Sequence, residues 1–60
     1  MVFEFYDYLF KLDESNNIHV YEYTENSLKY FDRIKGYEDL IEYEFQKICR
    51  EWHANNVLLV

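Results

Sequence analysis

The chain begins with the stretch that decides its fold: Phe3-Glu-Phe-Tyr-Asp-Tyr-Leu-Phe-Lys-Leu12, then Asp13-Glu-Ser-Asn-Asn17, then Ile18-His-Val-Tyr-Glu-Tyr23. The first part is rich in aromatic residues and alternates in the manner of a strand. The middle part is a cluster of turn-forming residues. The last part alternates again, so we predict a β-hairpin over residues 3–23.

The hairpin has a natural register. Pairing Leu12 with Ile18 and Phe10 with Val20 places Tyr8 opposite a glutamate on the same face. The other face carries Leu9, Lys11, His19, Tyr21 and Tyr23. Neither face is wholly polar, which is typical of a sheet that covers a core with one side and meets a partner chain with the other.

Residues 27–35 predict a short helix. Leu28, Phe31 and Ile34 recur every three residues and would form one apolar stripe. Polar residues precede this segment and can cap its start. Gly36, the only glycine, is placed to end it in a left-handed conformation.

Residues 37–52 fit two structures. Ile41, Tyr43 and Phe45 are separated by glutamates, as in a strand. A helical face would comprise Leu40, Ile41, Phe45, Ile48, Cys49 and Trp52. Helix propensity slightly favours the helix, and periodicity does not choose between the two.

Length and composition set limits on the fold. The chain has 60 residues, 12 acidic and 6 basic side chains, a net charge of −6 and seven tyrosines. A single domain of this size is marginally stable, and one cysteine, Cys49, excludes an intrachain disulfide. We therefore expect a homodimer. The free thiol and the lack of a signal peptide or long apolar run predict a soluble cytoplasmic protein.

The sequence offers little for catalysis or for a cofactor. We find no phosphate-binding loop, activated nucleophile or metal-ligand spacing. His19 is expected to be a half-exposed sheet residue, His53 has no activating neighbour in sequence, and Cys49 is expected to be a small buried hydrophobe. We predict a protein that is not an enzyme and holds no metal or cofactor. The acidic balance also predicts no binding to nucleic acid or to an anionic membrane.

Four segments together resemble a known family. They are Tyr6-Asp7, Tyr21-Glu22-Tyr23, Phe31-Asp32-Arg33-Ile34-Lys35-Gly36 and Glu38-Asp39-Leu40-Ile41-Glu42-Tyr43-Glu44-Phe45. Their order and spacing over about residues 6–45 resemble the small DNA-mimicking uracil-DNA glycosylase inhibitors of small Bacillus phages.

The resemblance implies a homodimer that occupies the basic DNA groove of the host uracil-DNA glycosylase in the infected cell. It would capture the apolar side chain that the enzyme inserts into DNA. A dimeric pocket lined by Leu28, Phe31 and Ile34 could hold that side chain. The family order of strand, strand, helix, strand favours a third strand at about residues 40–48, against the propensity argument. Residues 53–60 would form a C-terminal tail.

Site residues follow from the resemblance position by position. An interface glutamate falls on Glu22, the pocket phenylalanine on Phe31, and the following acidic residue on Asp32. Lys35 stands where the family has a tyrosine, which replaces a stacking ring by a positive charge. The expected partner-binding residues are Tyr21, Glu22, Tyr23, Leu28, Phe31, Asp32 and Lys35.

We thus predict an α+β fold with the order β-β-α-β and a non-enzymatic inhibitor of uracil-DNA glycosylase. One alternative is a DNA mimic directed at another host DNA-binding or defence protein. The other is an adaptor that binds a partner at an exposed strand edge.

Overall fold

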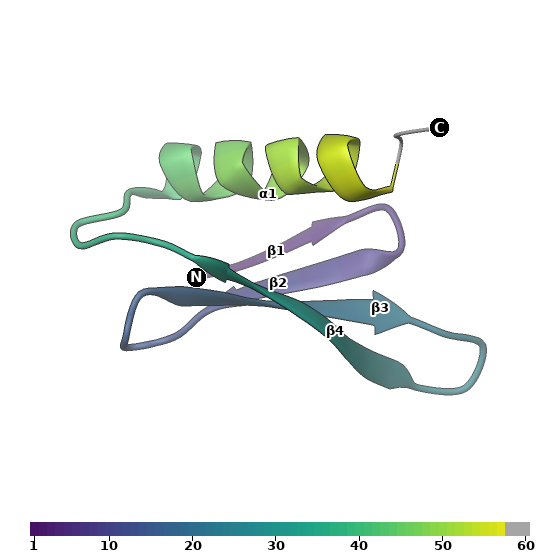
Figure 1. Cartoon of the computed structure of the whole chain (residues 1–60). Coiled ribbons are helices and arrows are strands. Elements are labelled where there is room, and N and C mark those ends of the chain that lie inside the picture. Colours follow the sequence, from purple (N-terminus) through teal and green to yellow (C-terminus); the bar gives the residue numbers. More distant parts are fainter. Residues whose placement is uncertain (58–60) are drawn as a thin grey trace.

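One antiparallel sheet and one helix make up the fold of the computed structural model, which describes residues 1–57 (Figure 1). The elements are β1 (Val2–Phe5), β2 (Tyr8–Leu12), β3 (Asn17–Tyr23), β4 (Leu28–Lys35) and α1 (Glu42–Asn56). Each strand pairs with its neighbour in sequence, so the sheet order is β1-β2-β3-β4. The α+β class is confirmed, but the order of elements is β-β-β-β-α.

The predicted hairpin register is confirmed. Strands β2 and β3 pair with Leu12 opposite Ile18 and Tyr8 opposite Glu22. The turn between them is held by the Asp13 carboxylate, which accepts hydrogen bonds from the backbone N–H groups two and four residues later, at 2.8 and 3.0 Å. An acidic residue at this position therefore fixes the turn and the register together.

The predicted first strand is two strands. A two-residue turn at Tyr6 and Asp7 separates β1 from β2 and places Phe5 opposite Tyr8. Tyr6 has φ of 55°, a conformation that a turn of this kind normally assigns to glycine or asparagine. Its ring stacks on His53, with ring centroids 5.1 Å apart. The sequence lacks the usual turn residues here, and this contact comes from a distant part of the chain.

The predicted helix at residues 27–35 is wrong, because this segment is strand β4. It pairs with β3 along its length, and Ile34 lies opposite Ile18. A three-residue spacing in an isolated segment carries no information about such a partner strand, which supplies the backbone hydrogen bonds that a helix would otherwise make internally. Gly36 is not in a left-handed conformation.

The predicted strand at residues 40–48 is also wrong, because α1 begins at Glu42. The helix agrees with the high helix propensity of these residues and differs from the strand that the family resemblance implies. At the start of α1, the Ile41 N–H donates a 3.4 Å hydrogen bond to the Glu44 side chain. The predicted tail at residues 53–60 is wrong for residues 53–56, which belong to α1. Residues 58–60 lie outside the described part.

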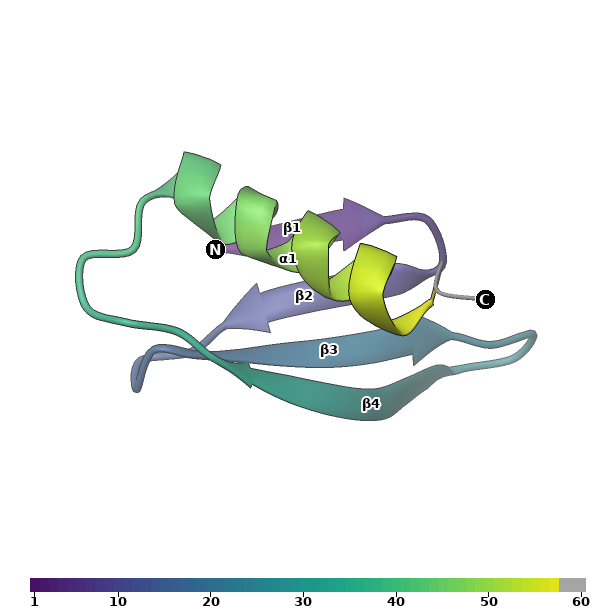
Figure 2. The same ribbon diagram turned by 45° about the horizontal axis from the view of Figure 1, so that its top comes forward.

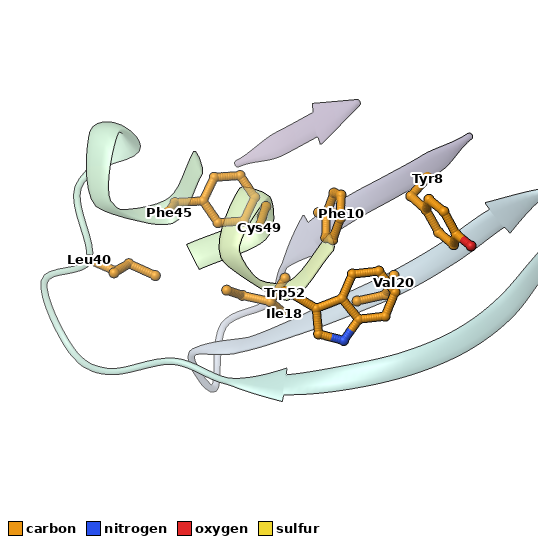
Figure 3. Packing of buried hydrophobic residues seen from close by; sticks show 8 residues of the cluster. All are labelled: Tyr8, Phe10, Ile18, Val20, Leu40, Phe45, Cys49 and Trp52. Carbon is orange, nitrogen blue, oxygen red and sulfur yellow. The ribbon is translucent and has the colours of Figure 1, made fainter. Parts of the chain in front are cut away.

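Helix α1 lies over one face of the twisted sheet (Figure 2). Its apolar face carries Phe45, Cys49 and Trp52, and these side chains point toward the strands (Figure 3). The buried core comprises Tyr8, Phe10, Ile18, Val20, Leu40, Phe45, Cys49 and Trp52. Cys49 is a small buried hydrophobe, as predicted. Nothing within residues 1–57 covers the other face of the sheet (Figure 1).

The open face of the sheet as candidate functional site

The uncovered side of the sheet, called here the open face, has two chemically different halves. Side chains alternate between the faces of a strand, and paired residues on neighbouring strands share a face. The basic half contains Lys11, His19 and Arg33, which lie side by side across β2, β3 and β4, together with Lys35. The tyrosine half contains Tyr21 beside Tyr30, and Tyr23 beside Leu28.

A β-bulge in β4 creates the tyrosine half. Asp32 lies opposite Val20, but the next residue of β3, Tyr21, lies opposite Tyr30, so Phe31 is an extra residue. In a regular strand Tyr30 would share the helix-covered face with Asp32, two residues away. The bulge turns Tyr30 to the open face instead. β4 contains no glycine, the residue that often marks a bulge, so the bulge could not be predicted from the residue pattern.

The aromatic side chains of the tyrosine half contact one another and their neighbours. The Tyr21 and Tyr30 rings meet edge to face with centroids 5.3 Å apart, and the Lys11 Nζ lies 5.7 Å from the Tyr21 ring centre. The Tyr23 hydroxyl donates a hydrogen bond to the Glu4 carboxylate on β1. This bond raises the pKa of Tyr23, because the ionised phenol would lose it and face a carboxylate.

A hydrogen-bonded chain joins the two halves. The His19 Nε2 lies 2.6 Å from Asp13 Oδ2, and its Nδ1 lies 2.9 Å from the Tyr30 hydroxyl. An ionised carboxylate only accepts, so Nε2 carries the proton, and in neutral His19 the Tyr30 hydroxyl donates to Nδ1. The bond from His19 is the main cause that lowers the pKa of Asp13, followed by the backbone N–H of Asn17.

A carboxylate, a histidine and a hydroxyl linked by successive hydrogen bonds also occur in catalytic triads. In such sites the reacting group lies in a water-excluded cavity beside donors for developing charge. Here the Tyr30 side chain is 51% exposed on a sheet surface. The arrangement therefore orients the Tyr30 ring beside Tyr21 and suits binding better than proton transfer.

The seven residues expected from the sequence to bind a partner are divided between the two faces. Tyr21, Tyr23, Leu28 and Lys35 lie on the open face, whereas Glu22, Phe31 and Asp32 lie on the helix-covered side. Phe31 packs with its ring centre 5.6 Å from that of Tyr8 and 5.8 Å from that of Trp52. Leu28 lies on the face of the sheet opposite Phe31 and Ile34, so these three side chains do not line one pocket within a single chain.

His53 is a buried residue that the sequence did not reveal. Only 3% of it is exposed, and its Nδ1 has no hydrogen-bond partner within the described residues. Its ring lies against Phe5, Tyr6 and Tyr8. His53 follows Cys49 by four residues, and residues four apart lie on the same face of a helix. This spacing could have predicted that His53 faces the core.

Residues 1–57 lack two further kinds of site, a pocket and a metal centre. They contain no pocket and no group of three or more side chains arranged to hold a metal ion. Their one helix is too short and too polar to cross a membrane. Comparisons with protein-family models, curated proteins and solved structures found no match.

Proposed function

We propose that this chain is a non-enzymatic protein that binds a partner protein through the open face of its sheet. The observation that supports this most is the tyrosine half, where Tyr23, Leu28 and Tyr30 are each more than 40% exposed on a preformed surface. Tyrosine and arginine are enriched at protein interfaces, because their side chains give large contact areas and keep polar groups for hydrogen bonds. Arg33 and the neighbouring lysines would add directional polar contacts at the edge of such an interface.

The strand edges are less suited to binding than the open face. β4 is a free edge within the described residues, but it carries Lys29, Arg33 and Lys35 as well as the bulge. Charged side chains and bulges are features by which proteins prevent pairing at an edge. β1, at the other edge, is only four residues long. We therefore favour docking on the face over addition of a partner strand.

Site-specific crosslinking tests this function. A photoreactive phenylalanine derivative at Tyr30 is expected to crosslink a partner in cells that produce the protein. The matched control carries the same group at Lys47, which is exposed on α1. The proposal requires a product specific to the Tyr30 position, lost when Tyr23 is replaced by serine. Equal products at both positions would contradict it.

Inhibition of uracil-DNA glycosylase by DNA mimicry is the second candidate, with the protein acting as a homodimer in the cytoplasm of an infected cell. The observation that favours it is the group of carboxylates Glu38, Asp39, Glu42 and Glu44 at the start of α1, three of them exposed. Spaced carboxylates could replace phosphates in a cationic groove. The test measures uracil excision by a purified bacterial glycosylase with excess inhibitor. Unchanged excision would exclude this candidate and leave the first one standing.

A further inference from the structure

A second exposed surface lies at the connection from β4 to α1. Residues 37–43, called here the acidic segment, carry the carboxylates Glu38, Asp39 and Glu42 on their surface. The same segment exposes 59% of Ile41 and 68% of Tyr43. Exposed apolar side chains that cluster on a small protein commonly mark an interaction surface.

The fold holds the acidic segment in one arrangement. Leu40 is buried beneath it, and Phe45 anchors the first turn of α1 in the core (Figure 3). Because these two side chains point inward, Ile41 and Tyr43 between them point outward. The connection projects at one end of the molecule, away from the open face (Figure 1). The segment is thus a preformed acidic and apolar surface.

The acidic segment and the open face are complementary in charge. Lys11, Arg33 and Lys35 are the cations of the open face, and its two nearby carboxylates, Glu4 and Asp13, are already hydrogen-bonded to Tyr23 and His19. The other two acidic residues of the paired strands β2 to β4, Glu22 and Asp32, lie on the helix-covered side. A protein with a net charge of −6 therefore has a basic surface next to its exposed tyrosines.

We infer that the open face of one copy binds the acidic segment of a second copy. This inference rests on the proposed function and names a partner for the same face. Glu38 and Glu42 would meet the basic half, while Ile41 and Tyr43 would pack on the tyrosine half. Charge attraction accelerates such an association, and apolar burial slows its dissociation.

The contact joins two different surfaces, and the acidic segment projects away from the open face, so we expect a head-to-tail contact rather than a reciprocal one about a two-fold axis. A pair joined by one such contact still offers one unused acidic segment, on the first copy, and one unused open face, on the second. Assembly then continues to a ring or an open chain. The expected signature is an average mass that rises beyond that of a dimer with protein concentration.

Sedimentation velocity over a concentration series tests this inference with two charge-reversal variants. The face variant is Arg33→Glu with Lys35→Glu, and the segment variant is Glu38→Lys with Glu42→Lys. Each alone should weaken self-association by at least about tenfold, because like charges then oppose each other. An equimolar mixture of the two variants should associate again, since each supplies the surface that complements the other.

A third variant separates docking from folding. Ile41→Ser removes the exposed isoleucine and introduces a favourable N-cap residue, so the melting temperature should rise. Self-association should nevertheless weaken. A wild-type chain that stays monomeric at about millimolar concentration overturns the inference. Weakening by the face variant but not by the segment variant also overturns it, since it indicates a face-to-face dimer. Neither result changes the crosslinking test of partner binding.

Discussion

The indole N–H of Trp52 donates a 2.9 Å hydrogen bond to the Asp32 carboxylate, and this bond joins α1 to strand β4. The Phe31 ring, next to Asp32, packs edge-on against the Trp52 ring. β4 has no other polar side-chain bond to α1 within residues 1–57. Trp52 thus contacts two adjacent residues of the edge strand that carries Tyr30 and Arg33, in addition to the packing of Ile34 against the core.

Replacing Trp52 by phenylalanine should destabilise the fold through loss of this bond and of ring contacts. The bond accounts for about 1 kcal/mol, as is usual for a hydrogen bond whose acceptor can return to water. A double-mutant cycle with Asp32→Ala isolates it, measured by urea unfolding. Trp52→Phe should cost less in the Asp32→Ala background than in the wild type. Equal costs in both backgrounds would show that the bond contributes nothing.

The Asp13 carboxylate predicts a specific acid sensitivity. Its pKa lies below the usual value in the folded state, mainly because His19 donates to it. A depressed pKa stabilises the folded state above the unfolded pKa of about 4, and this stability is lost as the pH falls through the lower folded value. Between pH 6 and pH 2.5 the urea midpoint should fall further for the wild type than for Asp13→Asn.

The matched control for this pH series is Glu14→Gln. Glu14 is an exposed acidic residue in the same turn, and its side chain makes none of the bonds that Asp13 makes. It should keep the acid sensitivity of the wild type. A pH profile of Asp13→Asn that parallels the wild type would contradict the assigned role of this carboxylate.

Gly36 is required for close approach of two chain segments. A Cβ atom there would lie 2.5 Å from the backbone oxygen of Asn16, the same oxygen to which the Gly36 N–H donates at 2.7 Å. Gly36→Ala must displace the β2–β3 turn from the end of β4 and should cost about 1–3 kcal/mol. Calorimetry should show a melting temperature lower by at least about 4 °C. Lys35→Ala, an exposed neighbouring position, should change it little.

Local patterns predicted the part of the fold that depends on local contacts. The β2–β3 register follows from alternation and from a turn that Asp13 closes, and both are readable in residues 8–23. The split of the first strand was missed because Tyr6 occupies a turn position that only its distant contact with His53 explains. Residues 28–35 form a strand because they pair with β3. The i, i+3 spacing of Leu28 and Phe31 carries no information about that pairing.

In the candidate site, too, the features that depend on local patterns were predicted, and those that depend on distant contacts were not. Alternation placed His19 and Tyr21 on the face opposite the core, and the structure agrees. Tyr30 was not expected there, because its position depends on the bulge at Phe31. In α1, the spacing of Phe45, Cys49 and Trp52 already indicated a helical face. The family resemblance, rather than the physical pattern, led to the strand prediction at residues 40–48.

Cys49 should report on the opening of the core. The side chain is fully buried, and burial raises the pKa of its thiol to about 12. A thiol reagent at pH 8 therefore reacts only when the chain opens, because the thiolate is the nucleophile. If the free energy of unfolding is about 3–5 kcal/mol, as is typical of a small domain, labelling should be on the order of 100 to 5,000 times slower than in urea.

The raised pKa of Cys49 also makes the stability of the protein depend on pH. The unfolded thiol ionises near pH 9, whereas the folded thiol does not until about pH 12, so stability should fall as the pH rises through 9. The Cys49→Ala variant has no thiol to ionise, so its free energy of unfolding should fall less between pH 8 and pH 9.5 than that of the wild type. The variant should nevertheless be less stable than the wild type at both pH values. Labelling of the native protein as fast as in urea would mean that the helix does not bury Cys49 in solution.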